Sequence, residues 1–188
     1  MLPHRNPALM MKTERETNWI GMYTVEKQRF FSFLPLNHVA ERLGVEVPAI
    51  VGGGEVSFAE NLASFADNIR DSRPTFIFAV PRIWTLFYQG VVDKVPERKL
   101  KLLLKLPILG KRVRQKILSE MGFDNLKIAA TGAAITPAFI KDFYRSLGIH
   151  LIEAYGMTEV SGGITNGCLL YTSPSPRDQR GSRMPSSA

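Results

Sequence analysis

The most constraining feature of this sequence is a stretch in which two apolar runs flank a helical pattern. Residues 126–131 (LKIAAT) and 149–154 (IHLIEA) are short apolar runs that predict buried strands. Between them, Thr136 and Pro137 are typical of a helix start, and Gly148 is typical of a helix end. A strand, a helix and a second strand in this order predict a βαβ unit, in which the two strands run parallel.

Two short polar segments follow these strands, and we expect them to meet. Residues 131–134 (TGAA) leave the first strand, and residues 155–159 (YGMTE) leave the second. The carboxyl ends of parallel strands lie at the same edge of a sheet, where open α/β folds bind their ligands. The sequence therefore predicts one crevice that is lined by both segments.

The residue types in these segments suit a nucleotide and a metal ion. Gly132 lets the backbone approach a planar base, and Tyr155 offers a ring face for stacking. Thr158 offers a hydroxyl to a phosphate, and Glu159 offers the hard oxygen ligand that Mg²⁺ prefers. The structural alternative is that Tyr155 fills the core while Thr158 and Glu159 cap a following helix. The spacing leaves both interpretations open.

The rest of the chain predicts further helices and strands around this unit. Amphipathic or leucine-rich patterns predict helices over residues 7–20, 57–74 and 97–121, the last of them broken near Pro107 and Gly110. Apolar and β-branched runs predict strands within 29–36, within 45–56 after a helix end at Gly44, and over 75–80. Together these elements predict an α/β fold with a mostly parallel sheet flanked by helices.

Composition limits the classes of protein that this chain can belong to. With 45% hydrophobic and 22% charged residues, the chain resembles an ordinary soluble globular domain. The single cysteine, Cys168, excludes an internal disulfide framework and a cysteine-rich zinc site. The three histidines are scattered rather than set at metal-ligand spacing. The sequence shows neither a secretory leader nor an apolar run of transmembrane length, so we expect a cytoplasmic location.

The net charge of +7 is concentrated in a basic, leucine-rich stretch from Lys99 to Lys116. A basic amphipathic helix can lie in a membrane interface, so this stretch predicts peripheral membrane contact as one hypothesis. The other hypothesis is a solvated helix face whose lysine stems cover apolar surface. A nucleic-acid partner is not predicted, because no recognised binding motif accompanies the charge.

Five blocks, taken in order, resemble the adenylate-forming acyl-CoA synthetases, and specifically their long-chain fatty-acid CoA ligase branch. The blocks are residues 1–6 (MLPHRN), 33–42 (FLPLNHVAER), 73–84 (RPTFIFAVPRIW), 131–139 (TGAAITPAF) and 153–162 (EAYGMTEVSG). The resemblance implies a reaction in which a fatty acid carboxylate attacks ATP to give an acyl-adenylate and pyrophosphate, and coenzyme A then displaces AMP. It also implies the fold of the large N-terminal domain of an adenylate-forming enzyme.

The resemblance implies a role for each residue of the matching blocks. The segment Gly132, Ala133 and Ala134 matches the family's adenine-contacting loop, and Tyr155 matches the tyrosine that stacks on the base, followed by Gly156 and Met157. Thr158 matches the phosphate-contacting threonine, and Glu159 matches the Mg²⁺ ligand. His38 matches a histidine near the acyl and pantetheine passage, although a loop-anchoring histidine is an equal interpretation of the same residue.

Departures from the family's pattern predict an internal fragment. The Ser/Thr/Gly-rich phosphate loop, the ribose-binding aspartate and the small C-terminal domain with its adenylation lysine have no counterpart here. Residues 168–188 change abruptly to Ser, Pro and Arg, which predicts a disordered tail, and the start of this tail resembles a translated sequencing adapter. We therefore expect residues 1–167 to be a partial adenylation domain that is inactive alone. The alternative from another class is a non-catalytic lipid- or membrane-binding α/β module.

Overall fold

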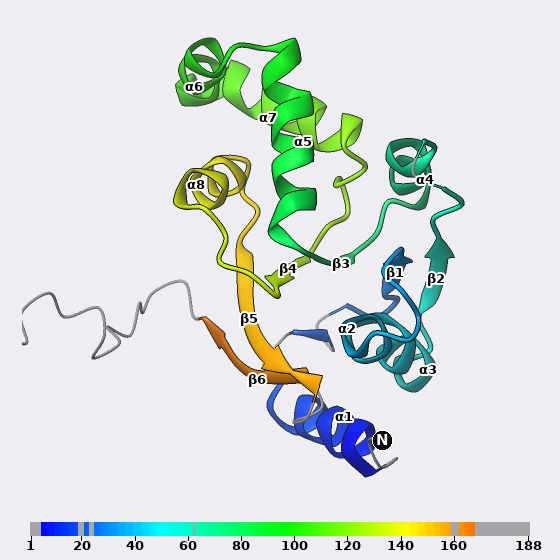
Figure 1. Ribbon diagram of the computed structural model, residues 1–188. Helices are drawn as coiled ribbons and strands as arrows, with labels where there is room; N and C mark the ends of the chain where they lie inside the picture. Colours follow the sequence, from blue (N-terminus) through cyan, green and yellow to red (C-terminus); the bar gives the residue numbers. More distant parts are fainter. Residues whose placement is uncertain (1–4, 19–20, 23–24, 62, 159–161, 168–188) are drawn as a thin grey trace, which may run out of the picture.

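A six-stranded sheet organises the part of the chain that the computed structural model describes, residues 5–18, 21–22, 25–61, 63–158 and 162–167 (Figure 1). In spatial order β2-β1-β3-β4-β5-β6, the first five strands are parallel to their neighbours, and β6 is antiparallel to β5. The strands are β1 (Arg29–Ser32), β2 (Glu55–Phe58), β3 (Phe76–Ala79), β4 (Ile128–Gly132), β5 (Leu151–Met157) and β6 (Gly162–Gly167). The predicted α/β class with a mostly parallel sheet is confirmed.

Helices cover both faces of this sheet (Figure 1). Near one face lie α1 (Arg5–Thr17), α2 (Val39–Glu41), the π-helical turn η2 (Arg42–Glu46) and α3 (Val47–Gly52). Near the other lie α4 (Phe65–Ser72), α5 (Pro81–Lys94), α6 (Glu97–Lys105), α7 (Pro107–Glu120) and α8 (Ala138–Ser146). Successive strand residues alternate between the faces, so Phe30 packs in the α1–α3 cluster while Phe31 packs in the α4–α8 cluster.

The larger of the two cores joins α5 to α8. Trp84 of α5 and Tyr144 of α8 are both fully buried, with ring centroids 5.0 Å apart. The Tyr144 hydroxyl donates a hydrogen bond of 2.8 Å to the Trp84 carbonyl, so the one polar atom of this ring is satisfied inside the core. This packing fixes α8, and therefore the loop before it, against the helical layer.

The predicted βαβ unit is present, with a shifted helix start. Strands β4 and β5 are parallel and joined by α8, which ends before Gly148 in the left-handed region, φ 84°. The helix begins at Ala138 with Pro137 at the cap position, and not with Thr136 as the cap. Thr136 is buried instead, and its hydroxyl lies 3.2 Å from the Thr131 hydroxyl. The Thr136 side chain therefore contacts the Thr131 hydroxyl of β4 instead of capping the helix, as the sequence had suggested.

The strand predicted within residues 45–56 is wrong over most of its length. Helical turns run from Val39 to Gly52, and Gly44 lies inside them rather than at a helix end. Val45 and Ala49, four residues apart, are both buried in the cluster that contains Phe30, which favours a helix over β-branched propensity. The strand in this region is β2, residues 55–58, which pairs with β1 at the edge of the sheet.

Other helix boundaries also differ from the predictions. Of the helix expected over 57–74, only Phe65–Ser72 is helical, because the side-chain Oδ1 of Asn61 accepts from the amides of Ala63 and Ser64 and forms a turn before it. The break between α6 and α7 falls at residue 106, close to the predicted site. Helix α1 spans 5–17 rather than 7–20, and α5 was not predicted as a helix from its pattern. The predicted tail, 168–188, lies outside the described residues.

Candidate functional site

A cavity of about 530 Å³ lies where β4 and β5 end, as the sequence predicted. The two strands pair with Gly132 opposite Ala154, so the loop after β4 and the end of β5 start from adjacent points. Both segments contribute to the lining, which includes Ala133, Ala154, Tyr155, Gly156, Met157 and Thr158. The two polar segments that lie more than twenty residues apart in sequence therefore border one space.

The loop after β4 is shaped by close packing. A Cβ on Gly132 would lie 2.9 Å from the Ala154 carbonyl oxygen and 3.1 Å from Cζ of Phe78, so β5 leaves no room for a side chain there. Ala133 has φ 67°, a left-handed conformation that is unfavourable for a residue with a Cβ. This strained turn brings Ala133 to the cavity, whereas Ala134 is exposed and is not part of the lining.

Tyr155 does not fill the core. The side chain is 61% exposed, although the residue belongs to β5 and lines the cavity. Met157 and Thr158 are exposed beside it. The alternative in which the tyrosine fills the core is therefore wrong. The alternative role of Thr158 and Glu159 as helix caps stays a prediction, because residues 159–161 lie outside the described residues. An exposed ring at the wall of a cavity can stack on a planar ligand.

His38 lies at the same cavity, and it also anchors a loop. It is the N-cap of α2, where its Nδ1 accepts a hydrogen bond of 3.1 Å from the amide of Ala40. Because Nδ1 is an acceptor, a neutral His38 carries its proton on Nε2 and can donate from there. Both interpretations of this residue are thus compatible in one geometry. His38 and residues 155–158 therefore line the same cavity, although no local sequence signal links them.

A carboxylate inside β5 braces the loop that carries Ala133. Glu153 accepts from the Thr136 amide through Oε1 at 3.1 Å and from the Lys141 ammonium through Oε2 at 2.9 Å. Partial burial raises the pKa of the Glu153 carboxyl, but the hydrogen bonds from Lys141 and Thr136 outweigh it, and the net pKa lies below its usual range. The brace therefore holds Glu153 ionised near neutral pH and fixes the loop end relative to β5.

Sequence analysis missed this brace. The signal was a charged residue inside the apolar run 149–154, directly before the segment that starts at Tyr155. A carboxylate on an otherwise apolar strand requires partners, and the partners come from the loop and helix between the two strands. Their identity could not be predicted, because the contacts depend on how α8 packs across the sheet.

Much of the remaining lining is apolar. It includes Met10 and Met22 from the α1 region, Leu34 and Leu43 around α2 and η2, and Phe78 of β3. The cavity therefore combines the exposed ring of Tyr155 and the hydroxyl of Thr158 with apolar side chains from neighbouring elements. A ligand with one polar aromatic part and one apolar part matches this lining.

A metal site is not defined by the described residues. Among residues 5–158 with their gaps, no group of three or more His, Cys, Asp or Glu side chains is positioned to hold an ion, and no Asp or Glu lines this cavity. Glu159, the predicted Mg²⁺ ligand, lies outside the described residues. The Mg²⁺ assignment therefore stays a prediction of the sequence.

Comparison with known proteins gives this cavity a family context. The family model described as "AMP-binding enzyme" matches residues 1–187. The long-chain-fatty-acid CoA ligase heimdall of Drosophila melanogaster is 31% identical over 195 aligned residues, which cover 88% of this chain and 28% of that protein. The chain spans less than a third of the length of the curated ligases that it matches.

Solved structures show the same fold. The adenylation domain of a carboxylic acid reductase from Segniliparus rugosus, in complex with AMP and a co-purified carboxylic acid, is 26% identical with a TM-score of 0.57, over 73% of this chain and 21% of that one. The corresponding domain from Mycobacterium chelonae is 25% identical with a TM-score of 0.58 and the same coverage. The structural neighbours are thus adenylate-forming enzyme domains.

Proposed function

Because the chain belongs to the AMP-binding enzyme family, we propose that its cavity between β4 and β5 binds the adenosine part of ATP and of an acyl-adenylate. We further propose that the protein of which it is a part activates a long-chain fatty acid and transfers it to coenzyme A, as its curated relatives' names indicate. The observation that carries the proposal is the pairing of Gly132 with Ala154, which puts both predicted segments at one cavity.

Each described residue has a distinct task in this proposal. The exposed ring of Tyr155 stacks on the adenine, and the backbone around Ala133 lies along the edge of the base because Gly132 keeps the loop tight against β5. The Thr158 hydroxyl donates to the α-phosphate. The glutamate brace at Glu153 orients the loop without touching the nucleotide.

The proposed site of the acyl chain is the apolar part of the lining, which includes Met10, Met22 and Leu34 and excludes water from the chain. In this placement the carboxylate is directed toward Thr158. The carboxylate then lies beside the α-phosphate that it attacks, which supplies the proximity that adenylation requires. His38 lines the same cavity, and its Nε2 proton is available to the carboxylate or the adenylate.

ATP, Mg²⁺ and coenzyme A are the co-reactants that the family resemblance implies. The described residues contain no carboxylate ligand for Mg²⁺ at the cavity, and no described group identifies where coenzyme A enters. Mg²⁺ would supply charge neutralisation of the triphosphate.

The proposal is tested by comparing AMP with adenosine on two variants of the 188-residue chain. Thr158→Val removes the phosphate-facing hydroxyl and is expected to weaken AMP about 10- to 100-fold, since a hydrogen bond to a charged group contributes roughly 1.5–3 kcal/mol. Adenosine, which lacks the phosphate, is expected to bind with unchanged affinity. Isothermal titration calorimetry measures both ligands.

The matched control is Thr17→Val, an exposed threonine of α1 that is not part of the cavity lining. It is expected to change neither ligand. Equal weakening of AMP and adenosine by Thr158→Val would contradict the phosphate assignment. Failure of the wild-type chain to bind either ligand would contradict the nucleotide site and favour the non-catalytic lipid-binding alternative.

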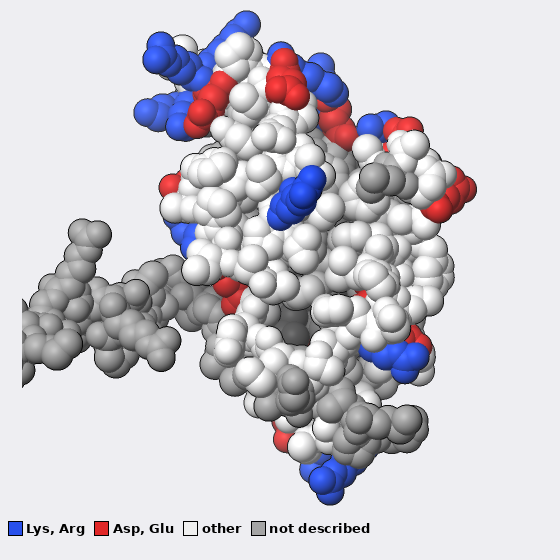
Figure 2. Space-filling model, viewed as in Figure 1, with Lys and Arg blue, Asp and Glu red and all other residues white. Residues whose placement is uncertain are grey.

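We also propose that the α6–α7 hairpin contacts an anionic membrane surface from the cytoplasmic side. Between residues 98 and 116 the sequence has eight Lys or Arg and no Asp or Glu. Leu102 and Ile108 are 65% and 75% exposed near the turn, and Figure 2 shows the cationic side chains gathered around this end of the molecule. Within the described residues, no helix is long and apolar enough to cross a bilayer.

Vesicle co-sedimentation tests this contact. The chain is expected to bind vesicles that contain phosphatidylserine more strongly than pure phosphatidylcholine vesicles, and binding should weaken with salt because each basic side chain near the surface contributes about 1 kcal/mol. Ile108→Ser is expected to weaken binding, whereas Ile50→Ser, an equally exposed isoleucine on α3, is not. Identical effects of the two substitutions would contradict the hairpin as the contact.

A further inference from the structure

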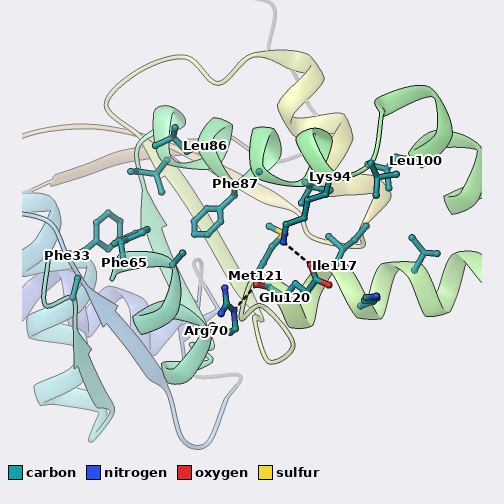
Figure 3. A pocket seen from close by; sticks show the side chains of 18 of the residues that line it. Phe33, Phe65, Arg70, Leu86, Phe87, Lys94, Leu100, Ile117, Glu120 and Met121 are labelled. Carbon is teal, nitrogen blue, oxygen red and sulfur yellow. Dashed lines mark hydrogen bonds and ion pairs between the residues drawn. The ribbon is translucent and has the colours of Figure 1, made fainter. Parts of the chain in front are cut away.

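A second and larger cavity, of about 940 Å³, lies on the opposite side of the sheet (Figure 3). It lies between α4, α5, α6 and α7, and Phe33 and Ala59 also line it. Among the described residues, none lines both this cavity and the cavity at the ends of β4 and β5. We call it the helix cavity. Its size falls within the range of roughly 300–1,000 Å³ that small-molecule sites occupy.

One face of α5 forms its longest wall. The contributing residues are spaced three or four apart along the helix: Ile83, Leu86, Phe87, Gly90, Val91 and Lys94. Figure 3 shows Phe87 and Lys94 extending from α5 toward Met121 and Ile117. Phe87 and Phe65, which both line the cavity, form an aromatic contact with ring centroids 6.1 Å apart. The lining is therefore apolar and fixed by core packing.

Gly90 leaves open space in the middle of this wall. A Cβ built on Gly90 would meet no heavy atom within 4 Å, so close packing does not require a glycine there. A glycine in a helix interior is less stable than alanine, and its backbone lies in the ordinary helical region. The residue thus lowers helix stability without a steric reason, while it keeps the centre of the cavity free.

The charges at the rim are predominantly positive. Lys94 pairs with Glu120 at 3.3 Å, and Arg70 pairs with Asp67 at 2.9 Å. Lys116 lines the same rim on α7 and forms no ion pair with any residue that the structure describes. An apolar space with an uncompensated cation at its edge is complementary to a molecule with one long hydrocarbon chain and one anionic head.

We propose that the helix cavity is a binding site for the anion of a long-chain fatty acid, separate from the cavity at the ends of β4 and β5. The hydrocarbon chain lies along the α5 face past Gly90, and the carboxylate lies at Lys116. Fatty-acid binding in the helix cavity requires no nucleotide. It can therefore be tested independently of nucleotide binding at the ends of β4 and β5.

A photoreactive fatty acid tests the proposal with a readout that identifies the site. The 188-residue chain is irradiated with a sixteen-carbon fatty acid that carries a diazirine in its chain, and the labelled peptides are mapped by mass spectrometry. Saturable labelling of α5 or α7, competed by palmitate, is expected. Labelling confined to residues 34–44 or 151–158 would place the probe in the other cavity and overturn the proposal.

A filling substitution and its control sharpen the test. Gly90→Leu occupies the space next to Phe87 and is expected to weaken labelling of α5 about tenfold or more, because each displaced methylene contact costs about fourfold in affinity. Gly52→Leu adds the same side chain to a helical glycine that also has open space and lies outside the cavity, and it should leave labelling unchanged. Equal labelling of wild type and Gly90→Leu would overturn the proposal.

The head-group assignment is tested by charge. Lys116→Gln is expected to weaken the fatty-acid probe about two- to fivefold, in line with an exposed ion pair, and to leave the matching fatty-alcohol probe unchanged. Lys111→Gln, on the same helix but away from the lining, is the control. Equal weakening of acid and alcohol by Lys116→Gln would overturn the carboxylate contact.

Discussion

The two cavities of this molecule are built in different ways. The cavity at the ends of β4 and β5 is shaped by backbone: the steric limit at Gly132, the left-handed Ala133 and the register that sets Gly132 opposite Ala154. The helix cavity is shaped by side chains of α5 and α7 at helical spacing. A site shaped by backbone is disrupted when a side chain replaces the glycine that allows the close approach. A site shaped by side chains changes its volume when the size of a lining residue changes. The same amino acid therefore has opposite roles at the two sites.

Glycine substitutions are expected to give the largest difference between the two sites. Gly132→Val forces its branched side chain against Phe78 and the Ala154 carbonyl, and should lower the free energy of unfolding by about 2–3 kcal/mol. Gly90→Ala meets open space and should raise it by about 0.5–1 kcal/mol. Urea denaturation measures both changes. Similar changes in the free energy of unfolding for Gly132→Val and Gly90→Ala would contradict the difference between the two cavities.

Tyr155→Ala is expected to separate binding from stability. Loss of the stacking ring should weaken AMP about tenfold, since base–aromatic stacking contributes roughly 1–3 kcal/mol. The free energy of unfolding should change by less than about 0.5 kcal/mol, because the side chain is mainly exposed. Tyr155→Phe keeps the ring and should bind like the wild type. A large stability loss in Tyr155→Ala with unchanged AMP affinity would restore the core-filling interpretation.

The brace at Glu153 should produce a smaller, pH-dependent effect. Lys141→Met removes one partner of a partly exposed pair and should cost about 0.5 kcal/mol at pH 7. The folded-state pKa of Glu153 is lowered, so the brace contributes stability above the ordinary glutamate pKa and loses it as pH falls through the lowered value. Thermal unfolding at pH 7 and pH 3 tests this. A difference between wild type and variant that persists at pH 3 would contradict the brace.

Glu41 gives the smallest expected effect, with the opposite sign. Burial raises the pKa of its carboxyl, an effect opposed by the hydrogen bond from the Leu34 amide, and the net pKa is above its usual range. A raised folded-state pKa means that stability falls as pH rises through that value. Glu41→Gln, whose amide oxygen still accepts from Leu34, should therefore stabilise the protein at pH 7 and lose this advantage near pH 4. An advantage that grows on acidification would contradict this assignment.

Much of the polar site could be predicted from sequence because its residues lie next to strand ends. The βαβ pattern fixed where 131–134 and 155–158 would meet, and the structure brings them together. The helix over 39–52 and the brace at Glu153 could not be predicted in this way. Burial of Val45 and Ala49 against a distant strand overrode local propensity, and Lys141 reaches Glu153 only through tertiary packing.

Only one wall of the helix cavity has a local sequence signal. The apolar residues of α5 have helical spacing, whereas the other walls come from α4, α6 and α7 and depend on how these helices pack against α5. The leucines of residues 100–106 were attributed to an amphipathic surface, but Leu100 is buried in the core while Leu102 is exposed. Which leucine faces inward depends on how the α6–α7 hairpin packs, and no periodicity within it gives that answer.

We propose that adenosine binds at the ends of β4 and β5. Photolabelling of the 188-residue chain with 8-azido-AMP, followed by peptide mapping, tests this binding, because the azide is attached to the base itself. We expect labelling of the peptides that contain Ala133 or Tyr155, reduced by excess AMP and by Tyr155→Ala but unaffected by Gly52→Leu. Labelling of α5 or α7, or labelling that AMP does not compete, would contradict the claim.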